Sequence, residues 1–194
     1  MPDFQKITDH YNKLCRYCEN FWKRTADTYP AEITCSPGCA ACCELQSVNL
    51  LEAYVIAEHC GRSRKGLANK CLGISSTSPL PGAGCPFLSD NRCRIYPVRP
   101  IICRTHGLLL KSREFRDRIA VSCPFNFTTI DHATIVSADT LDIDRITNNL
   151  ARLNAAFCML SGDAKKTIDR VALRDLASGK IGRSWFGFLM RARR

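Results

Sequence analysis

Four cysteines within nine residues, in the stretch CSPGCAACC, constrain this chain more than any other feature of its sequence. They are Cys35, Cys39, Cys42 and Cys43, and the chain holds 13 cysteines among 194 residues. Thiols at this density can form disulfides, act as nucleophiles or bind metal, and each use predicts a different protein. Because the count is odd, at least one thiol stays outside any intramolecular disulfide pairing.

The rest of the sequence predicts a cytoplasmic protein without a transmembrane segment. No run approaches the roughly 18 apolar residues that a membrane helix needs. The N-terminal stretch MPDFQKITDHYNKLC lacks the apolar core of a secretory signal, and Asp3 and Asp9 argue against a transit peptide. Since the cytoplasm keeps ordinary thiols reduced, clustered cysteines there favour metal ligation over disulfides.

A second group of cysteines follows in CPFLSDNRCRIYPVRPIICR and VSCPFN. Its members are Cys85, Cys93, Cys103 and Cys123. Eight cysteines in two groups of four suit either closed four-thiolate zinc sites or iron–sulfur clusters, and the sequence leaves both open. Adjacent Cys42 and Cys43 cannot easily face one metal, so one of them could serve the second centre or pack inside.

The order of these motifs resembles the YkgJ-like cysteine-cluster family, also called CxxCxxCC, whose members are described as zinc- or iron-chelating domains. The resemblance covers about residues 35–123. Its most specific parts are Cys-Pro-Phe-Leu at 85–88, Cys-x-Ile-Tyr at 93–96, Arg-Pro at 99–100 and Cys-Arg at 103–104. The chain departs from the family name in one respect, because three residues separate Cys35 from Cys39 where the name has two.

The resemblance implies that the eight cysteines hold zinc or an iron–sulfur cluster. Flagellin lysine N-methylases resemble the same family, which implies methyl transfer to a protein or peptide substrate. This chain is shorter than those enzymes, no sequence motif supports an S-adenosylmethionine site, and no catalytic residue is assigned. The alternative is a non-catalytic, zinc-braced module that binds a partner protein or nucleic acid.

Four residues near the second group are predicted to support the metal site. Tyr96, Arg99 and Arg104 could donate hydrogen bonds to thiolate sulfur or neutralise its charge. His106 could replace a thiolate or donate a hydrogen bond to one. Farther away, Glu52 could serve as an oxygen ligand or base, although a solvated helix face explains it equally well.

The remaining cysteines are interpreted mainly as core residues. Cys15 and Cys18 have the spacing of a ligand pair, but Cys18 lies on an apolar helical stripe, and free cysteine is commonly buried. Cys60 and Cys158 are predicted to be buried thiols. Cys71 has no assignment.

Hydrophobic spacing predicts a single, mostly α domain with irregular cysteine-rich segments braced by metal and one short β-hairpin. Apolar residues recur at three- and four-residue steps, which is typical of helices that pack one face on a core. Helices are predicted over 4–28, 48–60, 139–161 and 163–178, with Asn49 and Asp163 as N-caps. The segments between them are a turn-rich loop over 61–84, an irregular stretch over 85–104 and two short strands within 107–122.

The predicted organisation has four parts. They are an N-terminal helix over 1–34, a metal-binding core over 35–124, a helical part over 125–180 and a basic, aromatic tail over 181–194.

The formal net charge is +10, but eight thiolates around two dipositive centres would lower it to about +6. The tail could contact nucleic acid or an anionic surface.

Several enzyme classes are excluded by the motifs that the sequence lacks. It contains no Walker-type glycine loop, GxSxG elbow, HExxH pair or dinucleotide fingerprint. The CxxxCxxC spacing of Cys35, Cys39 and Cys42 matches radical iron–sulfur enzymes, but the repeating strand–helix pattern of their barrel is absent.

Overall fold

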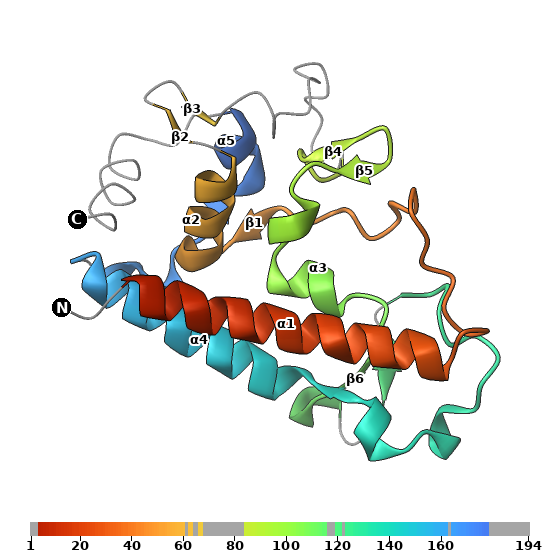
Figure 1. Cartoon of the computed structure of the whole chain (residues 1–194). Coiled ribbons are helices and arrows are strands. Elements are labelled where there is room, and N and C mark those ends of the chain that lie inside the picture. Colours follow the sequence, from red (N-terminus) through yellow and green to blue (C-terminus); the bar gives the residue numbers. More distant parts are fainter. Residues whose placement is uncertain are drawn as a thin grey trace.

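The computed structural model describes residues 4–60, 62–63, 66–67, 84–115, 119–121, 123–162 and 164–178, and helices dominate it (Figure 1). The α-helices are α1 (Phe4–Thr28), α2 (Leu50–His59), α3 (Ile101–Thr105), α4 (Ile143–Leu160) and α5 (Leu173–Ser178). The described sheets contain two or three strands of two or three residues each. The predicted mostly α fold is therefore confirmed.

The strands form four small sheets. Three are antiparallel pairs: β1 (Ser47–Val48) with β9 (Val171–Ala172), β2 (Arg62–Ser63) with β3 (Gly66–Leu67), and β4 (Leu88–Ser89) with β5 (Arg92–Cys93). The fourth has β6 (Leu109–Lys111) between antiparallel β7 (Ala120–Val121) and parallel β8 (Leu141–Asp142). Single 3-10 turns are η1 (Tyr96–Val98), η2 (Arg113–Phe115), η3 (His132–Thr134), η4 (Ser137–Asp139) and η5 (Ala164–Ile168).

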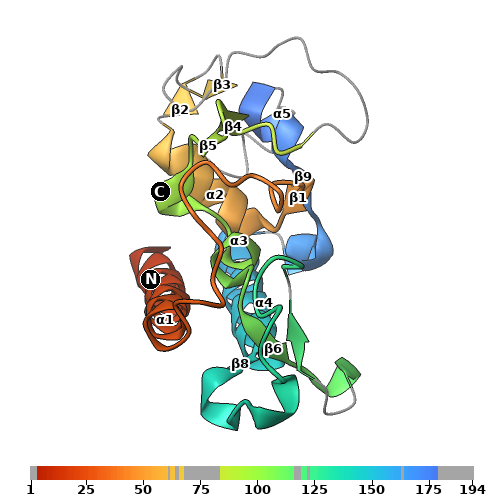
Figure 2. The same ribbon diagram turned by 90° about the vertical axis from the view of Figure 1, so that its right-hand side faces the viewer.

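The long helices α1 and α4 lie side by side and build the main core together with α2 and α3 (Figures 1 and 2). The apolar stripe predicted for residues 4–28 is buried, and the helix bounds match the prediction. The buried side chains include Ile7, Tyr11, Leu14, Cys18, Phe21, Leu50, Leu51, Ile146 and Phe157. The N-terminal helix and the C-terminal half of the chain therefore share one core.

A second core lies on the other side of α2 and reaches the cysteine-rich region. It contains Val48, Ile56, Phe87, Ile95, Leu173 and Leu176, and the half-buried Cys85 and Cys93 pack against it. Helix α2 is buried on several sides because it lies between the two cores. Asn49 caps it as predicted, accepting a hydrogen bond from the backbone N–H of Glu52 at 3.0 Å.

Helix α4 begins later than predicted. The acidic residues from 139 onward favoured an earlier start, but Leu141 and Asp142 form β8 and pair with β6. The Asp142 side chain then accepts the backbone N–H of Arg145 at 2.9 Å and caps the helix. Pairing with a strand distant in sequence is thus preferred to one more helical turn.

The helix predicted over 163–178 is wrong as a continuous element. The segment forms η5, β9 and then the short helix α5, while Asp163 lies outside the described residues. Strand β9 pairs with β1, and the Leu173 N–H donates to the Gln46 carbonyl at 2.8 Å. These long-range hydrogen bonds outweigh the local helical pattern, because helical propensity is a weak preference.

The connecting segments follow the prediction only in part. The two strands expected within 107–122 are β6 and β7. The irregular stretch expected over 85–104 instead holds the β4–β5 hairpin, η1 and the start of α3, because short elements fit between its prolines. Within the loop predicted over 61–84, β2 and β3 form a short hairpin. Most of the loop predicted over 61–84 and all of the 181–194 tail lie outside the described residues. Among the described helices, none has the length and apolar character needed to cross a membrane.

Asn154 joins α4 to α2 and to η5. It is 3% exposed, its Oδ1 accepts the Leu51 N–H at 3.1 Å, and its Nδ2 donates to the Thr167 carbonyl at 2.9 Å. We expect Asn154→Ala to lower the free energy of unfolding by about 1–3 kcal/mol, because the buried Leu51 N–H and the half-buried Thr167 carbonyl lose their partner. Urea unfolding measures this, with exposed Asn148→Ala on the same helix as the control; an equal loss in both variants would contradict it.

Candidate metal centre

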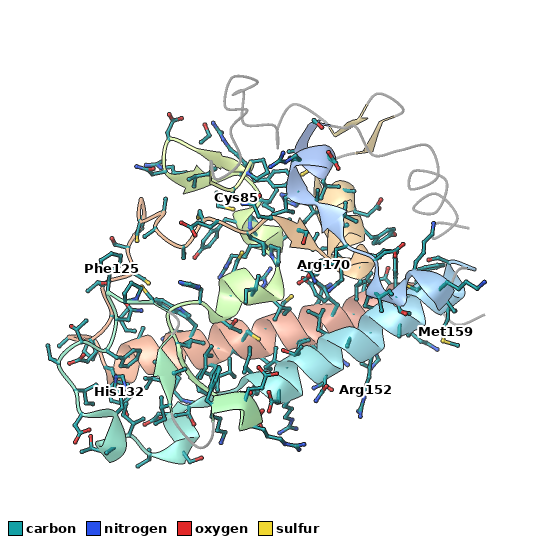
Figure 3. The ribbon with its side chains drawn as sticks, turned by 180° about the vertical axis from the view of Figure 1, so that it is seen from behind. Cys85, Phe125, His132, Arg152, Met159 and Arg170 are labelled. Carbon is teal, nitrogen blue, oxygen red and sulfur yellow. The ribbon has the colours of Figure 1, made fainter. Side chains whose placement is uncertain are left out.

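All eight predicted ligand cysteines lie within the described residues, and they come from four separate segments. These are the loop before β1, the β4–β5 hairpin, helix α3 and the segment after β7 (Figures 1 and 3). Cys39, Cys42 and Cys103 are exposed and Cys123 is buried. The remaining four, Cys35, Cys43, Cys85 and Cys93, are half-buried.

The loop holding the first four cysteines consists of tight turns. The Cys39 N–H donates to the Ser36 carbonyl at 3.0 Å, and the Cys43 N–H donates to the Ala40 carbonyl at 2.9 Å. Gly38 has a φ of 97°, which a residue with a side chain rarely adopts. The thiols of the adjacent Cys42 and Cys43 lie close to each other, but Cys123 is near Cys42 whereas Cys85 and Cys93 are near Cys43.

Cys43 lies against the β4–β5 hairpin. Its carbonyl accepts the Cys85 N–H at 2.6 Å, and a Cβ at Gly84 would lie only 2.9 Å from the same oxygen. Burial raises the pKa of the Cys43 thiol, and the negative charge of nearby Cys85 and Cys93 thiolates raises it further. Cys43 therefore belongs with the cysteines of the hairpin.

The hairpin itself brings Cys85 and Cys93 together. Asp90 and Asn91 both have positive φ values, 51° and 56°, as a two-residue type I′ turn requires. The register places Cys93 opposite Leu88, whose N–H donates to the Cys85 carbonyl at 3.0 Å. The sequence offered a signal for this turn, because Asp and Asn tolerate the left-handed conformation.

Helix α3 adds Cys103 to this group. Burial raises the pKa of Cys103 to about 12, and Cys85, Cys93 and Cys43 thiolates add to the increase. Four cysteines from three segments thus lie near one another. We call Cys43, Cys85, Cys93 and Cys103 the hairpin set.

The other four cysteines gather around Asn126, a residue not predicted from the sequence. Its Nδ2 lies 3.5 Å from the Cys35 Sγ, and its backbone N–H donates to the Cys123 carbonyl at 3.3 Å. Burial raises the pKa of Cys35, Asn126 opposes this through its hydrogen bond, and thiolates of Cys123, Cys39 and Cys42 raise it again. We call Cys35, Cys39, Cys42 and Cys123 the Asn126 set.

Asn126 is only 2% exposed and joins three segments of backbone. Its Oδ1 accepts the Thr34 N–H at 3.0 Å, and its Nδ2 donates to the Gly107 carbonyl at 2.9 Å. A Cβ at Gly107, whose φ is 86°, would lie 2.8 Å from Asn126 Nδ2 and 3.3 Å from Cys35 Sγ. A glycine is therefore needed beside Cys35.

The structure groups the cysteines differently from their order along the chain. Cys43 lies with the downstream cysteines, and Cys123 lies with the upstream ones. Within the described residues, no three or more His, Cys, Asp or Glu side chains are placed closely enough to hold one metal ion. Each set is thus a group of neighbouring sulfur donors and not a closed ligand shell. Soft sulfur donors suit zinc or iron–sulfur.

The predicted supporting residues have varied surroundings. Tyr96 is 59% exposed, and the Arg99 guanidinium carbon lies 4.0 Å from the centre of its ring. The Arg99 charge favours the thiolate of Cys93, although burial has the larger effect and raises the pKa of that thiol. His106 is half-buried, and burial lowers the pKa of its ring.

Arg104 directs its hydrogen bonds to protein groups other than sulfur. It is 4% exposed, and it donates to the Arg99 carbonyl at 2.8 Å, to the Pro97 carbonyl at 2.9 Å and to the Glu19 carboxylate. Glu19 also lies 3.5 Å from Arg99. Arg104 thus fixes the turn before Cys103 and ties it to α1.

One interpretation of the sequence placed Glu52 on a solvated helix face, and the structure contradicts it. It is 4% exposed, its Oε1 accepts the Ile101 N–H at 2.9 Å, and its Oε2 accepts the Asn49 Nδ2 at 3.0 Å. Burial raises its pKa. The reciprocal Asn49–Glu52 bonds resemble a capping box, a pattern that the sequence contained.

The other cysteines are largely core residues. Cys15, Cys18 and Cys158 are buried, as predicted, and burial raises the pKa of Cys18 to about 12. Cys60 is buried but takes part in a disulfide, so its prediction as a free thiol is wrong. Cys71 lies outside the described residues.

The buried carboxyl of Glu52 predicts a pH dependence. Because folding raises the pKa of Glu52, the folded state binds the carboxyl proton more tightly than the unfolded state does. The stability gained from this proton is lost as the pH rises from the ordinary glutamate range toward the raised pKa. We expect the stability of the native chain relative to Glu52→Gln to fall from about pH 5 to about pH 8. Urea unfolding at both pH values tests this against exposed Glu114→Gln, and a difference independent of pH would contradict it.

Comparison with known proteins agrees with the chemistry of these sets. Residues 34–124 match the model of the CxxCxxCC family, described as a "putative zinc- or iron-chelating domain". No curated protein and no solved structure matches the chain significantly. The matched segment contains all eight cysteines of the two sets, and this cysteine-rich part of the chain, residues 34–124, belongs to the CxxCxxCC family.

Proposed function

We propose that this chain is a metal-binding protein that holds two cysteine-ligated metal centres, one in each set. The Asn126 set, Cys35, Cys39, Cys42 and Cys123, would supply four thiolates to one centre. The hairpin set, Cys43, Cys85, Cys93 and Cys103, would supply four to the other. Four sulfur ligands per centre satisfy either zinc or an iron–sulfur cluster.

The position of Cys43 against the hairpin is the observation that supports this proposal most strongly. Neighbouring side chains cannot easily reach one metal, and the Cys43 backbone is hydrogen-bonded to the hairpin through Cys85. With Cys43 assigned there, each set has four sulfurs. A single centre would leave half of these thiols without a role.

Metal binding would also relieve an electrostatic cost. Burial and neighbouring sulfurs raise the thiol pKa values of Cys43 and Cys103, so that the metal-free thiols stay protonated at neutral pH. A cation stabilises thiolates and releases their protons, which couples metal binding to the fold. Zinc would then brace the loops, whereas an iron–sulfur cluster could also transfer electrons.

Each set has a side that faces solvent. Cys39 and Cys42 are exposed in the Asn126 set, and Cys103 is exposed in the hairpin set. This exposure supports metal entry and exchange.

The family match adds no support for the other predictions made from the sequence, which stay predictions. These are methyl transfer to a protein or peptide, binding of a partner or nucleic acid, a cytoplasmic location, and the division into 1–34, 35–124, 125–180 and 181–194.

The metal can be identified on protein purified without oxygen. We expect about two zinc ions per chain and no colour, or iron with sulfide and a broad absorption near about 400 nm. Elemental analysis and a visible spectrum distinguish the two. A chain that purifies folded, without bound metal, and fails to take up zinc or a reconstituted cluster would contradict the proposal.

Paired serine substitutions test how the cysteines are divided. We expect Cys43→Ser with Cys103→Ser to remove one centre, and Cys42→Ser with Cys43→Ser to remove both, because the second pair takes one ligand from each set. Elemental analysis of the purified variants gives the metal content per chain.

The alternative division by sequence order gives the reverse result. In that case Cys42→Ser with Cys43→Ser would remove one centre, and Cys43→Ser with Cys103→Ser would remove both. Cys15→Ala, a buried thiol of α1 outside both sets, is the control and should keep the full metal content.

A further inference from the structure

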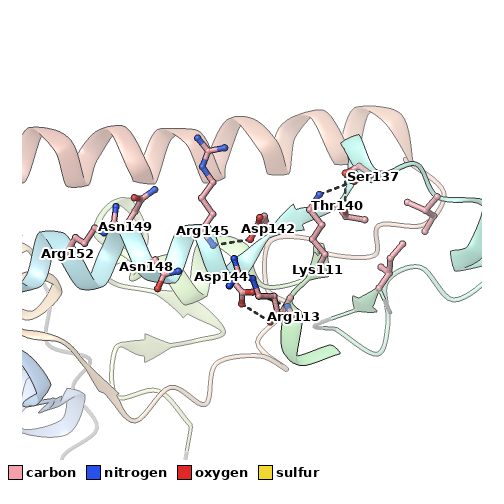
Figure 4. Close-up of a pocket in the computed structure, with 13 residues that line it drawn as sticks. Lys111, Arg113, Ser137, Thr140, Asp142, Asp144, Arg145, Asn148, Asn149 and Arg152 are labelled. Carbon is pink, nitrogen blue, oxygen red and sulfur yellow. Dashed lines mark hydrogen bonds between the residues drawn. The ribbon is translucent and has the colours of Figure 1, made fainter. Parts of the chain in front are cut away.

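A cavity of about 840 Å³ lies at the start of α4, and it contains none of the eight cysteines (Figure 4). Residues from β6, η2, η4 and α4 line it. Among the described residues that line it, the only large apolar side chains are Ile119 and Ile135, and none is aromatic. The volume suits a small-molecule ligand, but the polar lining is unusual for a site that binds through apolar contact.

One face of α4 supplies a continuous row of hydrogen-bond donors to this cavity. Arg145, Asn148, Asn149 and Arg152 all line it, at spacings of three and four residues. The two arginines are both exposed and lie two helical turns apart, about 10 Å along the axis. A different face of the helix packs into the main core through Ile146 and Phe157.

Two further cations complete the cavity. Lys111 donates to the Ser137 hydroxyl at 2.9 Å, which keeps its ammonium at the rim, and Arg113 follows on η2. Arg113 interacts electrostatically with the Asp144 carboxylate. Among the ion pairs of the described residues, none involves Lys111, Arg145 or Arg152. Their charge is therefore available to a ligand.

The two lining carboxylates are already engaged by backbone donors. Asp142 accepts the Arg145 N–H at 2.9 Å. Asp144 accepts the Ser112 hydroxyl at 2.7 Å and the Arg113 N–H at 3.0 Å. They fix the helix start and η2, and the four lining cations still outnumber them.

We propose that this cavity binds phosphate groups, with Arg145 and Arg152 as the main contacts and the two asparagine amides between them. Guanidinium groups bind phosphate through paired, charge-assisted hydrogen bonds, and amide N–H groups add neutral ones. The described lining consists mainly of charged and amide side chains, so recognition rests on the phosphates. The site adds a binding activity separate from the two metal centres.

Calorimetric titration of the full-length, metal-loaded chain with tripolyphosphate tests the proposal. We expect one binding site, and we expect Arg145→Gln with Arg152→Gln to weaken binding by about tenfold or more, because two charge-assisted contacts are lost. Lys13→Gln with Arg16→Gln changes the net charge equally at exposed α1 positions outside the cavity, and its affinity should match the native chain.

Absence of tripolyphosphate binding to the native chain, or equal weakening in both double variants, would overturn the proposal. Adenosine triphosphate and a single-stranded RNA of about 12 nucleotides then identify the source of the phosphate. One-to-one binding of adenosine triphosphate that depends on both arginines indicates a free phosphorylated molecule. Tighter RNA binding that also depends on both arginines indicates a phosphodiester backbone. If both probes bind the double arginine variant as tightly as the native chain, the result contradicts the site.

Discussion

The short helix α3 is held in place by carboxyl side chains from two other helices. Glu52 of α2 accepts the first backbone N–H of α3, and Glu19 of α1 binds Arg104 near its end. A five-residue helix has no stability of its own, so these contacts determine where Cys103 lies. The hairpin set therefore depends on polar side chains of the helical part of the molecule.

Buried charges are tolerable only when their hydrogen-bonding groups are satisfied. Glu52 accepts from Ile101 and Asn49, and Arg104 donates to two carbonyls as well as to Glu19. Asn126 performs the equivalent task for the other set with neutral groups. Both cysteine sets thus rest on polar side chains that fix the backbone around the sulfurs.

The sequence was sufficient for elements whose pattern is local. The stripe from Phe4 to Phe21 predicted α1, and Asn49 predicted the start of α2. It was insufficient where distant backbone decides the outcome. Residues 171–172 became a strand because β1 was available to pair with them, and the start of α4 was displaced by pairing with β6.

The candidate ligands were identifiable from spacing, but their division into sets was not. That division depends on tight turns around Cys39 and Cys43 and on the hairpin turn at Asp90 and Asn91. Asn126 carried no sequence signal, because a polar residue in a loop is usually exposed. Its burial follows from the approach of Gly107 and Thr34, which are far from it along the chain.

Anomalous X-ray diffraction from crystals of the metal-loaded chain, recorded at the absorption edge of the bound metal, tests the central claim most directly. The account predicts two separate metal positions. One is surrounded by the sulfurs of the Asn126 set, with Cys42, and the other by those of the hairpin set, with Cys43. A single metal position, or two positions with Cys42 and Cys43 bound to the same one, would contradict it.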